Sequence, residues 1–191
     1  MLDFQATLET KPEKAIKLEK DALAQIETIT VDNARLVSNL HANLGGLYRM
    51  NGHPDLAREH MEKSISLLDQ FNLLHINDSI PQIANYAMFL TEQQEPERGI
   101  SELQKLSGII KEYHSDDCLD YAKVQETLGT IYLMTANLPQ AKTHFKRAFK
   151  IYEKIWADEP EMIEAKYQEI QELYPQIGFC IGKNLSGLLT K

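Results

Sequence analysis

The chain repeats a pattern of residue types every 42 positions. The hexapeptides NLGGLY, NYAMFL and TLGTIY begin at residues 43, 85 and 127, and the third residue of each is small. Other positions keep the same step: Ala57, Gly99 and Ala141, followed by Leu68, Ile110 and Tyr152. A fixed period of this length is typical of stacked helical hairpins that share a continuous core. It predicts an all-α solenoid of four to five hairpins without β-sheet.

Small residues inside the predicted helices indicate where two helices come close together. Gly45 and Gly129 lie in the middle of helical segments, where glycine costs about 1 kcal/mol relative to alanine. A helix accepts this cost when a neighbouring backbone must approach, and Ala57 and Ala141 supply small partners on the following helix. The run MNGHP at residues 50–54 separates the two helices, because glycine ends one helix and proline begins the next.

The period divides the chain into units within one predicted domain, residues 1–191. The units cover about 1–31, 32–73, 74–115, 116–157 and 158–191. We expect helices near 2–9, 12–29, 32–50, 54–71, 79–93, 96–113, 117–136, 139–156, 160–174 and 177–189. By the same step, residue 1 falls in the middle of a first helix and residue 191 near the end of a second one. The chain is therefore either a segment of a longer solenoid or a small protein with short end units.

These residues resemble the tetratricopeptide repeat. The motifs LGGLY at 44–48 and LGTIY at 128–132 match the family's spacing to their small partners on the next helix, and the step of 42 is similar to that of the kinesin light chain subtype. The middle copy departs from the pattern through Ala87, Leu90 and Gly99. The resemblance covers nearly the whole chain. It implies a right-handed superhelical solenoid of antiparallel helix pairs that binds protein or peptide on its concave face, and it does not imply kinesin.

Composition limits the partners and the compartment. The chain has 191 residues, of which 43% are hydrophobic and 25% charged, as in ordinary globular proteins. No run approaches the roughly 18 apolar residues of a membrane span, and the first residues lack the regions of a signal peptide. Cys118 and Cys180 are far apart, so we expect reduced thiols in a cytoplasmic protein. A net charge of −8 argues against nonspecific binding to nucleic acid or anionic membranes.

The resemblance assigns the concave groove to the first helix of each pair. Residues just before the small residue, and one turn after it, would point into the groove. The predicted binding residues are Asn39, Asn43, Gly46, Arg49, Met50, Asn85, Met88, Glu92, Lys123, Glu126, Thr127, Thr130 and Met134. Asn43 and Asn85 match the second asparagine of the kinesin-light-chain NNLA stretch. Ala42 and Ala84 replace the first asparagine, and Thr127 replaces the second one in the later copy.

The asparagines suggest how such a groove would hold a partner. An amide can donate to a peptide backbone and accept from it at once, so it binds an extended chain without selecting a sequence. Met50, Met88 and Met134 would add an adaptable apolar lining. The alternative is that Asn43 and Asn85 only bond neighbouring helices, because polar side chains are commonly satisfied within a protein. The paired Lys/Asn carboxylate clamp of chaperone-binding relatives is absent.

A basic stripe follows one predicted helix. Lys142, Lys146, Lys150 and Lys154 recur at every fourth position. One interpretation is a docking strip for an acidic partner. The other is the solvated back of an amphipathic helix, since exposed helix faces are normally charged.

Few motifs could carry chemistry. The loop His114-Ser115-Asp116-Asp117-Cys118 holds groups that can bind metal, but its residues are also common at helix connections, where Asp116 or Asp117 would serve as an N-cap. His41 is expected to be a hydrogen-bonded core histidine. The sequence contains no phosphate-binding loop, nucleophile elbow or zinc-protease motif. We therefore expect no catalytic activity, no metal ion and no cofactor.

Two classes of function remain. The first is a non-catalytic scaffold that binds a protein or peptide in the concave groove, with no nucleic acid or membrane partner. The second is a regulatory domain that senses a ligand or peptide within a larger signalling or transcriptional protein. The open ends of a solenoid would also allow homo-oligomerisation.

Overall fold

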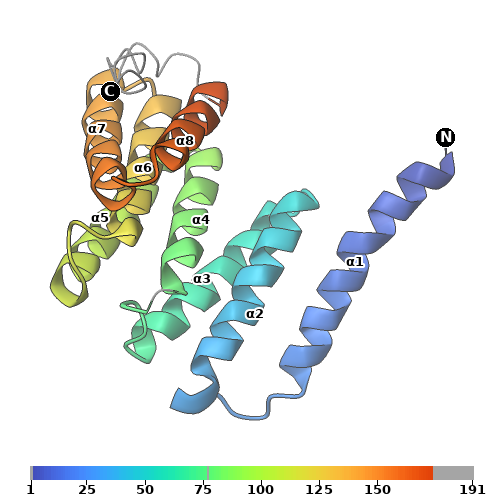
Figure 1. The fold of residues 1–191 in the computed structure, drawn as a ribbon. Coiled ribbons are helices and arrows are strands. Elements are labelled where there is room, and N and C mark those ends of the chain that lie inside the picture. The colour runs from blue at the N-terminus through green and yellow to red at the C-terminus, as the bar shows by residue number, and fades with distance from the viewer. Residues whose placement is uncertain (1, 77, 174–191) are drawn as a thin grey trace. The chain divides into compact units, whose positions relative to one another are not determined.

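The computed structural model describes residues 2–76 and 78–173. These residues form eight α-helices and no strand (Figure 1). The helices are α1 (Leu2–Ala24), α2 (Val31–Met50), α3 (Pro54–Gln70), α4 (Ser79–Glu92), α5 (Pro96–Tyr113), α6 (Leu119–Met134), α7 (Leu138–Ile155) and α8 (Pro160–Leu173). They fall into two compact units, Met1–Gln93 and Gln94–Lys191. The all-α prediction is confirmed, whereas the organisation into one continuous domain stays a prediction.

Most predicted helix boundaries agree with the structure, but the N-terminal ones do not. From α2 to α8, every end lies within two residues of its predicted position. The predicted break between residues 9 and 12 is wrong, because α1 continues through Pro12. A proline removes one hydrogen bond from a helix and bends it, but need not end it. The predicted helix at 177–189 lies outside the described residues.

The early end of α1 has a local cause. A helix was expected to run to residue 29, but α1 stops at Ala24. Thr30 adopts extended backbone and begins α2 as its N-cap. The side chain of Asn33 accepts a hydrogen bond from the Thr30 amide at 2.8 Å and donates to the carbonyl of Thr28 at 2.9 Å. These bonds stabilise a non-helical connection before α2.

Unit 1 is built around a close contact between α2 and α3, which lie side by side (Figure 1). A Cβ atom added at Gly45 would lie 2.5 Å from Cγ of Met61 and 3.3 Å from the carbonyl oxygen of Ala57. Leu44 and Tyr48 flank this contact and belong to the buried core. Helix α2 also contacts α1 and α4, so it is the central helix of unit 1. Gly45 therefore lies where sequence analysis predicted close helix packing.

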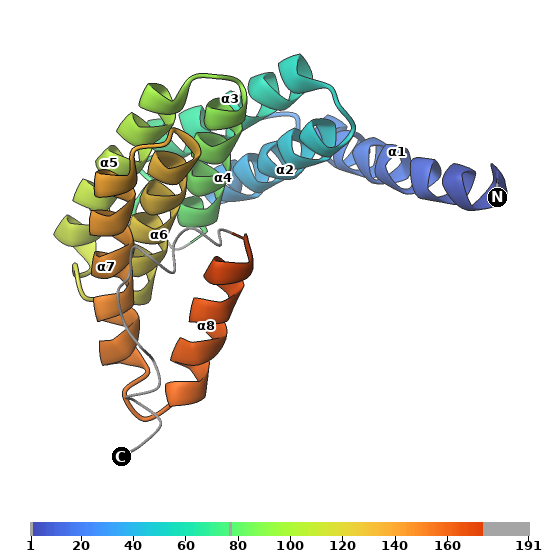
Figure 2. The ribbon, with the colours of Figure 1, turned by 90° about the horizontal axis from the view of Figure 1, so that it is seen from above.

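Unit 2 repeats this contact between α6 and α7, which run side by side in Figure 2. A Cβ atom at Gly129 would lie 2.9 Å from the ring of Phe145. Phe145 and Tyr152 are fully buried on the inner face of α7. Helix α5 packs against α6, and α8 packs against α7.

The turn within each hairpin has the same backbone conformation. Gly52 and Ala136 stand two repeats apart, and both have left-handed backbone, with φ of 74° and 58°. In both turns an amide reaches back to a tyrosine carbonyl: His53 to Tyr48 at 2.9 Å, and Asn137 to Tyr132 at 2.7 Å. Such bonds satisfy carbonyl groups at the helix end. The fold thus demands a left-handed residue here even where the sequence offers no glycine.

A polar pair and an aromatic stack lie inside each hairpin. In unit 1, Nδ1 of His41 and Nδ1 of His60 are 2.9 Å apart, and His60 stacks on Tyr48. Burial, and then the nearby positive charges of His60 and Lys63, lower the pKa of His41 to about 4. His41 is hydrogen-bonded as expected, but it is half-buried and not part of the fully buried core.

The equivalent positions of unit 2 keep the arrangement with one exchange. Gln125 replaces the first histidine, and its Oε1 lies 2.9 Å from Nδ1 of His144. His144 stacks on Tyr132, with 5.3 Å between the ring centroids. Burial also lowers the pKa of His144. The hairpins therefore share a part-buried hydrogen bond and a ring stack in addition to their glycine contact.

Candidate functional site

Unit 1 contains a groove of about 850 Å³ between α2 and α4, with residues of α3 on its floor. We call it the amide groove, because asparagine and glutamine side chains line it. Seven of the predicted binding residues line the groove: Asn39, Asn43, Gly46, Arg49, Met50, Asn85 and Glu92. The lining also includes Ala42, Met61, Ser64, Asp78, Pro81 and Gln82. The last five of these were not predicted, because they lie on α3 or at the start of α4.

Helical periodicity brings the α2 residues together. Asn39, Asn43, Gly46 and Met50 follow one another at steps of three or four residues, so they share one helix face. Gly46 is open on this face, since a Cβ atom there would meet nothing within 4 Å. Its neighbour Gly45 faces α3 instead and has no such room. The two adjacent glycines therefore have different roles: Gly45 permits packing, and Gly46 leaves space in the groove.

A buried polar network fixes part of the groove floor. Ser38 and Ser64 are almost completely buried. Their hydroxyls donate to Oε1 of Gln82 at 2.8 and 2.6 Å. The Gln82 amide then donates to Oδ1 of Asn39. Because the two serines hold the carbonyl end of Gln82, the Asn39 oxygen is engaged in the free protein. Ser38, Ser64 and Gln82 were missed from the sequence, since the equivalent positions elsewhere in the repeat are not all polar, whereas Asn39 was predicted.

Two ion pairs join α2 to α4. Arg35 lies 2.6 Å from Asp78 near the start of both helices. Arg49 pairs with Glu92 near their ends. Both pairs are partly exposed, so each contributes at most about 1 kcal/mol to stability. They place charged groups on either side of the amides, which leaves the middle of the groove neutral.

Asn43 and Asn85 both line the groove but differ in their contacts. The amide of Asn43 donates to Oε1 of Glu19 on α1 at 3.0 Å. The other oxygen of Glu19 is buried without a hydrogen-bond partner among the described residues. Asn85 is exposed and makes no hydrogen bond within the part of the chain that the structure describes. Asn43 is therefore tied to a neighbouring helix, whereas Asn85 is free to meet a partner.

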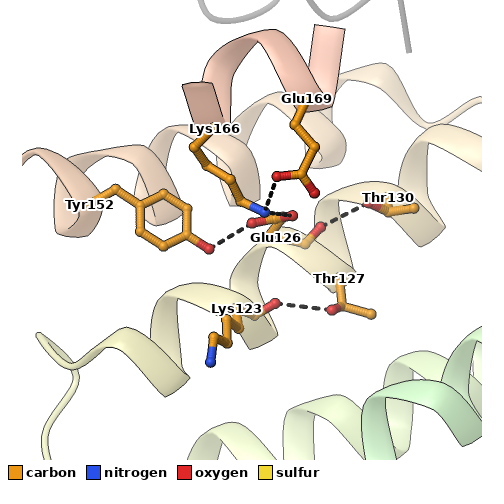
Figure 3. Close-up of polar contacts among 7 residues, drawn as sticks. All are labelled: Lys123, Glu126, Thr127, Thr130, Tyr152, Lys166 and Glu169. Atoms are coloured by element: carbon orange, nitrogen blue, oxygen red, sulfur yellow. Dashed lines mark hydrogen bonds and ion pairs between the residues drawn. The ribbon is translucent and has the colours of Figure 1, made fainter. Parts of the chain in front are cut away.

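The predicted residues of unit 2 lie in a different environment. Glu126 accepts a hydrogen bond from Tyr152 at 2.6 Å and forms an ion pair with Lys166 at 3.0 Å (Figure 3). Lys166 also contacts Glu169 at 3.1 Å. Tyr152 comes from α7 and Lys166 from α8, so Glu126 ties three helices together. This carboxylate is used within the fold.

The Glu126 contacts also change the proton affinity of their partners. Burial and the Glu126 carboxylate raise the pKa of Tyr152, so its hydroxyl keeps its proton and donates. Burial alone would lower the pKa of Lys166, but the charge of Glu126 and hydrogen bonds to Glu126 and Glu169 outweigh it and raise that pKa. Lys166 therefore stays charged.

The remaining predicted residues also lie outside the amide groove. The hydroxyls of Thr127 and Thr130 donate to backbone carbonyls of their own helix, at 3.0 and 3.1 Å (Figure 3). Lys123 pairs with Asp120 at 3.7 Å. Met88 is half-buried and does not line the amide groove, and Met134 is 46% exposed at the end of α6. The early predicted residues thus line the amide groove, whereas the later ones lie outside it.

The loop before α6 has a capping role. The N-cap of α6 is Cys118, whose sulfur accepts from the Tyr121 amide at 3.4 Å. The expected cap at Asp116 or Asp117 is therefore wrong. In the described ranges, no three histidine, cysteine, aspartate or glutamate side chains come together in a way that would hold a metal ion. No helix of these ranges is long and apolar enough to cross a membrane.

Comparison with known proteins agrees with the helical-repeat fold. Residues 79–154 match the tetratricopeptide repeat family model. BtubC (BKLC) from P. vanneervenii has a similar fold, with a TM-score of 0.67 and 20% identity over 78% of this chain and 58% of that one. The chain thus spans little more than half of that protein. No curated protein matches the sequence.

A second solved structure is similar to the same extent. This structure shows the nearly identical TPR-like repeats of a Podosopora anserina protein that is named as a kinesin light chain. The TM-score is 0.66 and the identity 14%, over 78% of this chain and 70% of that one. The predicted resemblance to tetratricopeptide repeats of this type is confirmed at the level of the fold. Folds of this type are typically non-catalytic scaffolds for protein interaction.

Proposed function

We propose, from this tetratricopeptide-like fold, that the chain is a non-catalytic scaffold that binds an extended segment of a partner protein in the amide groove. The observation that carries the proposal is the groove itself, which combines open space at Gly46 with the unpartnered amide of Asn85. An amide in such a place can donate to a backbone carbonyl and accept from a backbone N–H. The two widely spaced cysteines of the sequence favour a cytoplasmic location.

The groove chemistry favours backbone contacts. Its central side chains are neutral, and its charged lining residues are already paired: Asp78 with Arg35, and Arg49 with Glu92. A small charged ligand would find no free charge among these pairs. Met50 is 81% exposed beside the groove and offers a flexible apolar contact. An extended peptide with an apolar side chain near Met50 fits this combination.

The test begins with peptides selected from a random display library against the whole chain. Their affinities are then measured for the wild type and for Gly46→Phe, which fills the groove. Gly108→Phe is the matched control, because Gly108 is also helical and a Cβ atom there meets nothing within 4 Å. Gly46→Phe should weaken binding by more than about tenfold, equivalent to about 1.4 kcal/mol. Gly108→Phe should leave affinity unchanged.

Substitution of the amides sharpens the result. Asn85→Ala should weaken binding by about 1–3 kcal/mol, because a peptide group buried against it loses its partner. The stability of the Asn85→Ala variant should equal that of the wild type, since Asn85 is exposed and makes no hydrogen bond among the described residues. Asn43→Ala should lower both affinity and stability through the lost bond to Glu19. Full affinity in Gly46→Phe would show that binding occurs elsewhere.

A further inference from the structure

A second concave surface lies wholly in unit 2 and is independent of the amide groove. It is a pocket of about 650 Å³ at the end of α5, the connection to α6 and the outer face of α7. Five cationic side chains line it: Lys111, Lys146, Arg147, Lys150 and Lys154. We call it the basic pocket. Two acidic residues, Asp116 and Asp117, complete one part of its rim.

The concentration of positive charge runs against the rest of the chain, whose net charge is −8. The register of α7 produces it, because Lys146, Lys150 and Lys154 recur every fourth residue. Like charges at this spacing repel and destabilise a helix slightly. The lysine spacing therefore lowers helix stability slightly. Packing does not offset this loss, since all three side chains are exposed.

Most of these charges are not neutralised within the described residues. Lys154 pairs with Asp117. Lys111 lies over the ring of Tyr121, with 5.2 Å between its nitrogen and the ring centroid. By contrast, Lys146, Arg147 and Lys150 form no ion pair in residues 2–76 and 78–173. Three cations therefore face solvent together around one concave surface.

The equivalent helix two repeats earlier, α3, shows whether the fold itself requires basic residues at these positions. The residues two repeats earlier, at the places of Lys146, Arg147, Lys150 and Lys154, are Glu62, Lys63, Ser66 and Gln70. The fold therefore does not require a basic solvent face on this helix. Lys142 differs, since its equivalent is Arg58, which is basic too. Lys142 does not line the pocket.

We propose that the basic pocket binds an acidic segment of a partner protein. Carboxylates of the segment would pair with Lys146, Lys150 and the guanidinium of Arg147, which suits bidentate contact. The pocket floor includes Tyr121 and Ile151, which are 3% and 5% exposed and can contact an aliphatic stem. Charge complementarity selects the partner's sign. The chain's net charge of −8 disfavours the denser negative charge of a nucleic acid.

The experiment uses the whole chain and a fluorescein-labelled polyglutamate peptide, with a polyglutamine peptide of equal length as the neutral probe. Fluorescence anisotropy is measured for the wild type, for Lys146→Glu/Lys150→Glu and for the control Lys142→Glu. We expect binding of polyglutamate alone, a loss of about tenfold or more in the double variant, and weaker binding at high salt. The control, which leaves the pocket intact, should stay within about twofold of the wild type, because a single charge outside the contact has a small effect.

Four results would overturn the proposal. The first is no binding of polyglutamate to the wild type, and the second is an equal loss in Lys142→Glu, which would indicate a general charge effect. The third is tighter binding of a single-stranded oligonucleotide than of polyglutamate, which would indicate a nucleic acid site. The fourth is a wild-type dimer in sedimentation that Lys146→Glu/Lys150→Glu converts to monomer, which would make a second copy the occupant. Circular dichroism of each variant verifies folding, and Gly46→Phe should bind polyglutamate normally.

Discussion

The hairpins α2–α3 and α6–α7 have the same interior and different surfaces. Each has a glycine against the next helix, a histidine stacked on tyrosine and a left-handed residue in its turn. On the surface, Ala42 lines an open groove, whereas its equivalent Glu126 is bonded to Tyr152 and Lys166. The outer face is mixed in α3 and basic in α7. The repeat therefore fixes the contacts between paired helices and leaves the outward positions free to acquire separate functions.

The largest expected effect tests the shared glycine contact. Gly129→Leu should destabilise the protein by about 3 kcal/mol or more, because a side chain there meets the buried ring of Phe145. Lys142→Leu on the exposed face of α7 should change stability by less than about 0.5 kcal/mol. Urea unfolding of both variants measures the difference. Equal midpoints would mean that the two helices do not meet closely at Gly129.

The next effect tests the difference between the hairpins. Glu126→Ala copies the alanine of the first hairpin and should cost about 1–3 kcal/mol, because the buried Tyr152 hydroxyl loses its acceptor. Glu169→Ala removes only the more exposed contact of Lys166 and should cost less than about 0.5 kcal/mol. Chemical denaturation of the two variants provides the comparison. A similar cost for both would show that Glu126 is no more structural than Glu169.

The turns allow a reciprocal exchange. Ala136→Gly should stabilise the protein by up to about 1 kcal/mol, because alanine is strained at a φ of 58°. Gly52→Ala should destabilise it by about the same amount, since alanine would then occupy a φ of 74°. Thermal unfolding measures both. Shifts of the same sign would contradict the common turn conformation.

The smallest effect concerns pH. Unfolded His41 takes up a proton near its ordinary pKa of 6.5, whereas folded His41 does so only at about 4. Between these values the unfolded state binds more protons, so stability is present above pH 6.5 and is lost as the pH falls toward 4. His41→Gln copies Gln125 and should reduce this loss. The effect is modest because the site is only half-buried.

Urea unfolding at neutral and acidic pH tests this last expectation. His53→Gln is the control, because His53 is exposed in the turn. It should leave the acid-induced loss of stability unchanged. An identical pH dependence in His41→Gln and the wild type would exclude the His41–His60 pair as its source.

The sequence predicted the interior better than the surface. Gly45, Gly129 and their partners were recognised because the period repeats them and because glycine within a helix has few explanations. The groove residues of α2 were predicted from the resemblance to tetratricopeptide repeats, and helical spacing places them on one face. By contrast, the left-handed conformation of Ala136 could not be predicted, since alanine gives no signal for positive φ. It accompanies the turn's local hydrogen bond from the Asn137 amide to the Tyr132 carbonyl.

Long-range polar contacts account for the rest. Glu126 was predicted to face a groove, which its helix position supports, but its bonds depend on Tyr152 and Lys166 from two other helices. The floor residues Ser64 and Gln82 were missed for the same reason. Side chains that meet across helices leave no periodic trace in a sequence. Cys118 was missed as a cap because sulfur is an uncommon capping group.

The short turn at Gly52 has a consequence for how the protein folds. It joins α2 and α3 so closely that His41 and His60, which meet across the hairpin, are only 19 residues apart in the chain. Contacts of such short range form quickly, because little chain entropy is lost in closing the loop. The hairpin should therefore appear early in refolding. In pulse-labelling hydrogen exchange during refolding, the α2 amides should be among the first of the chain to become protected.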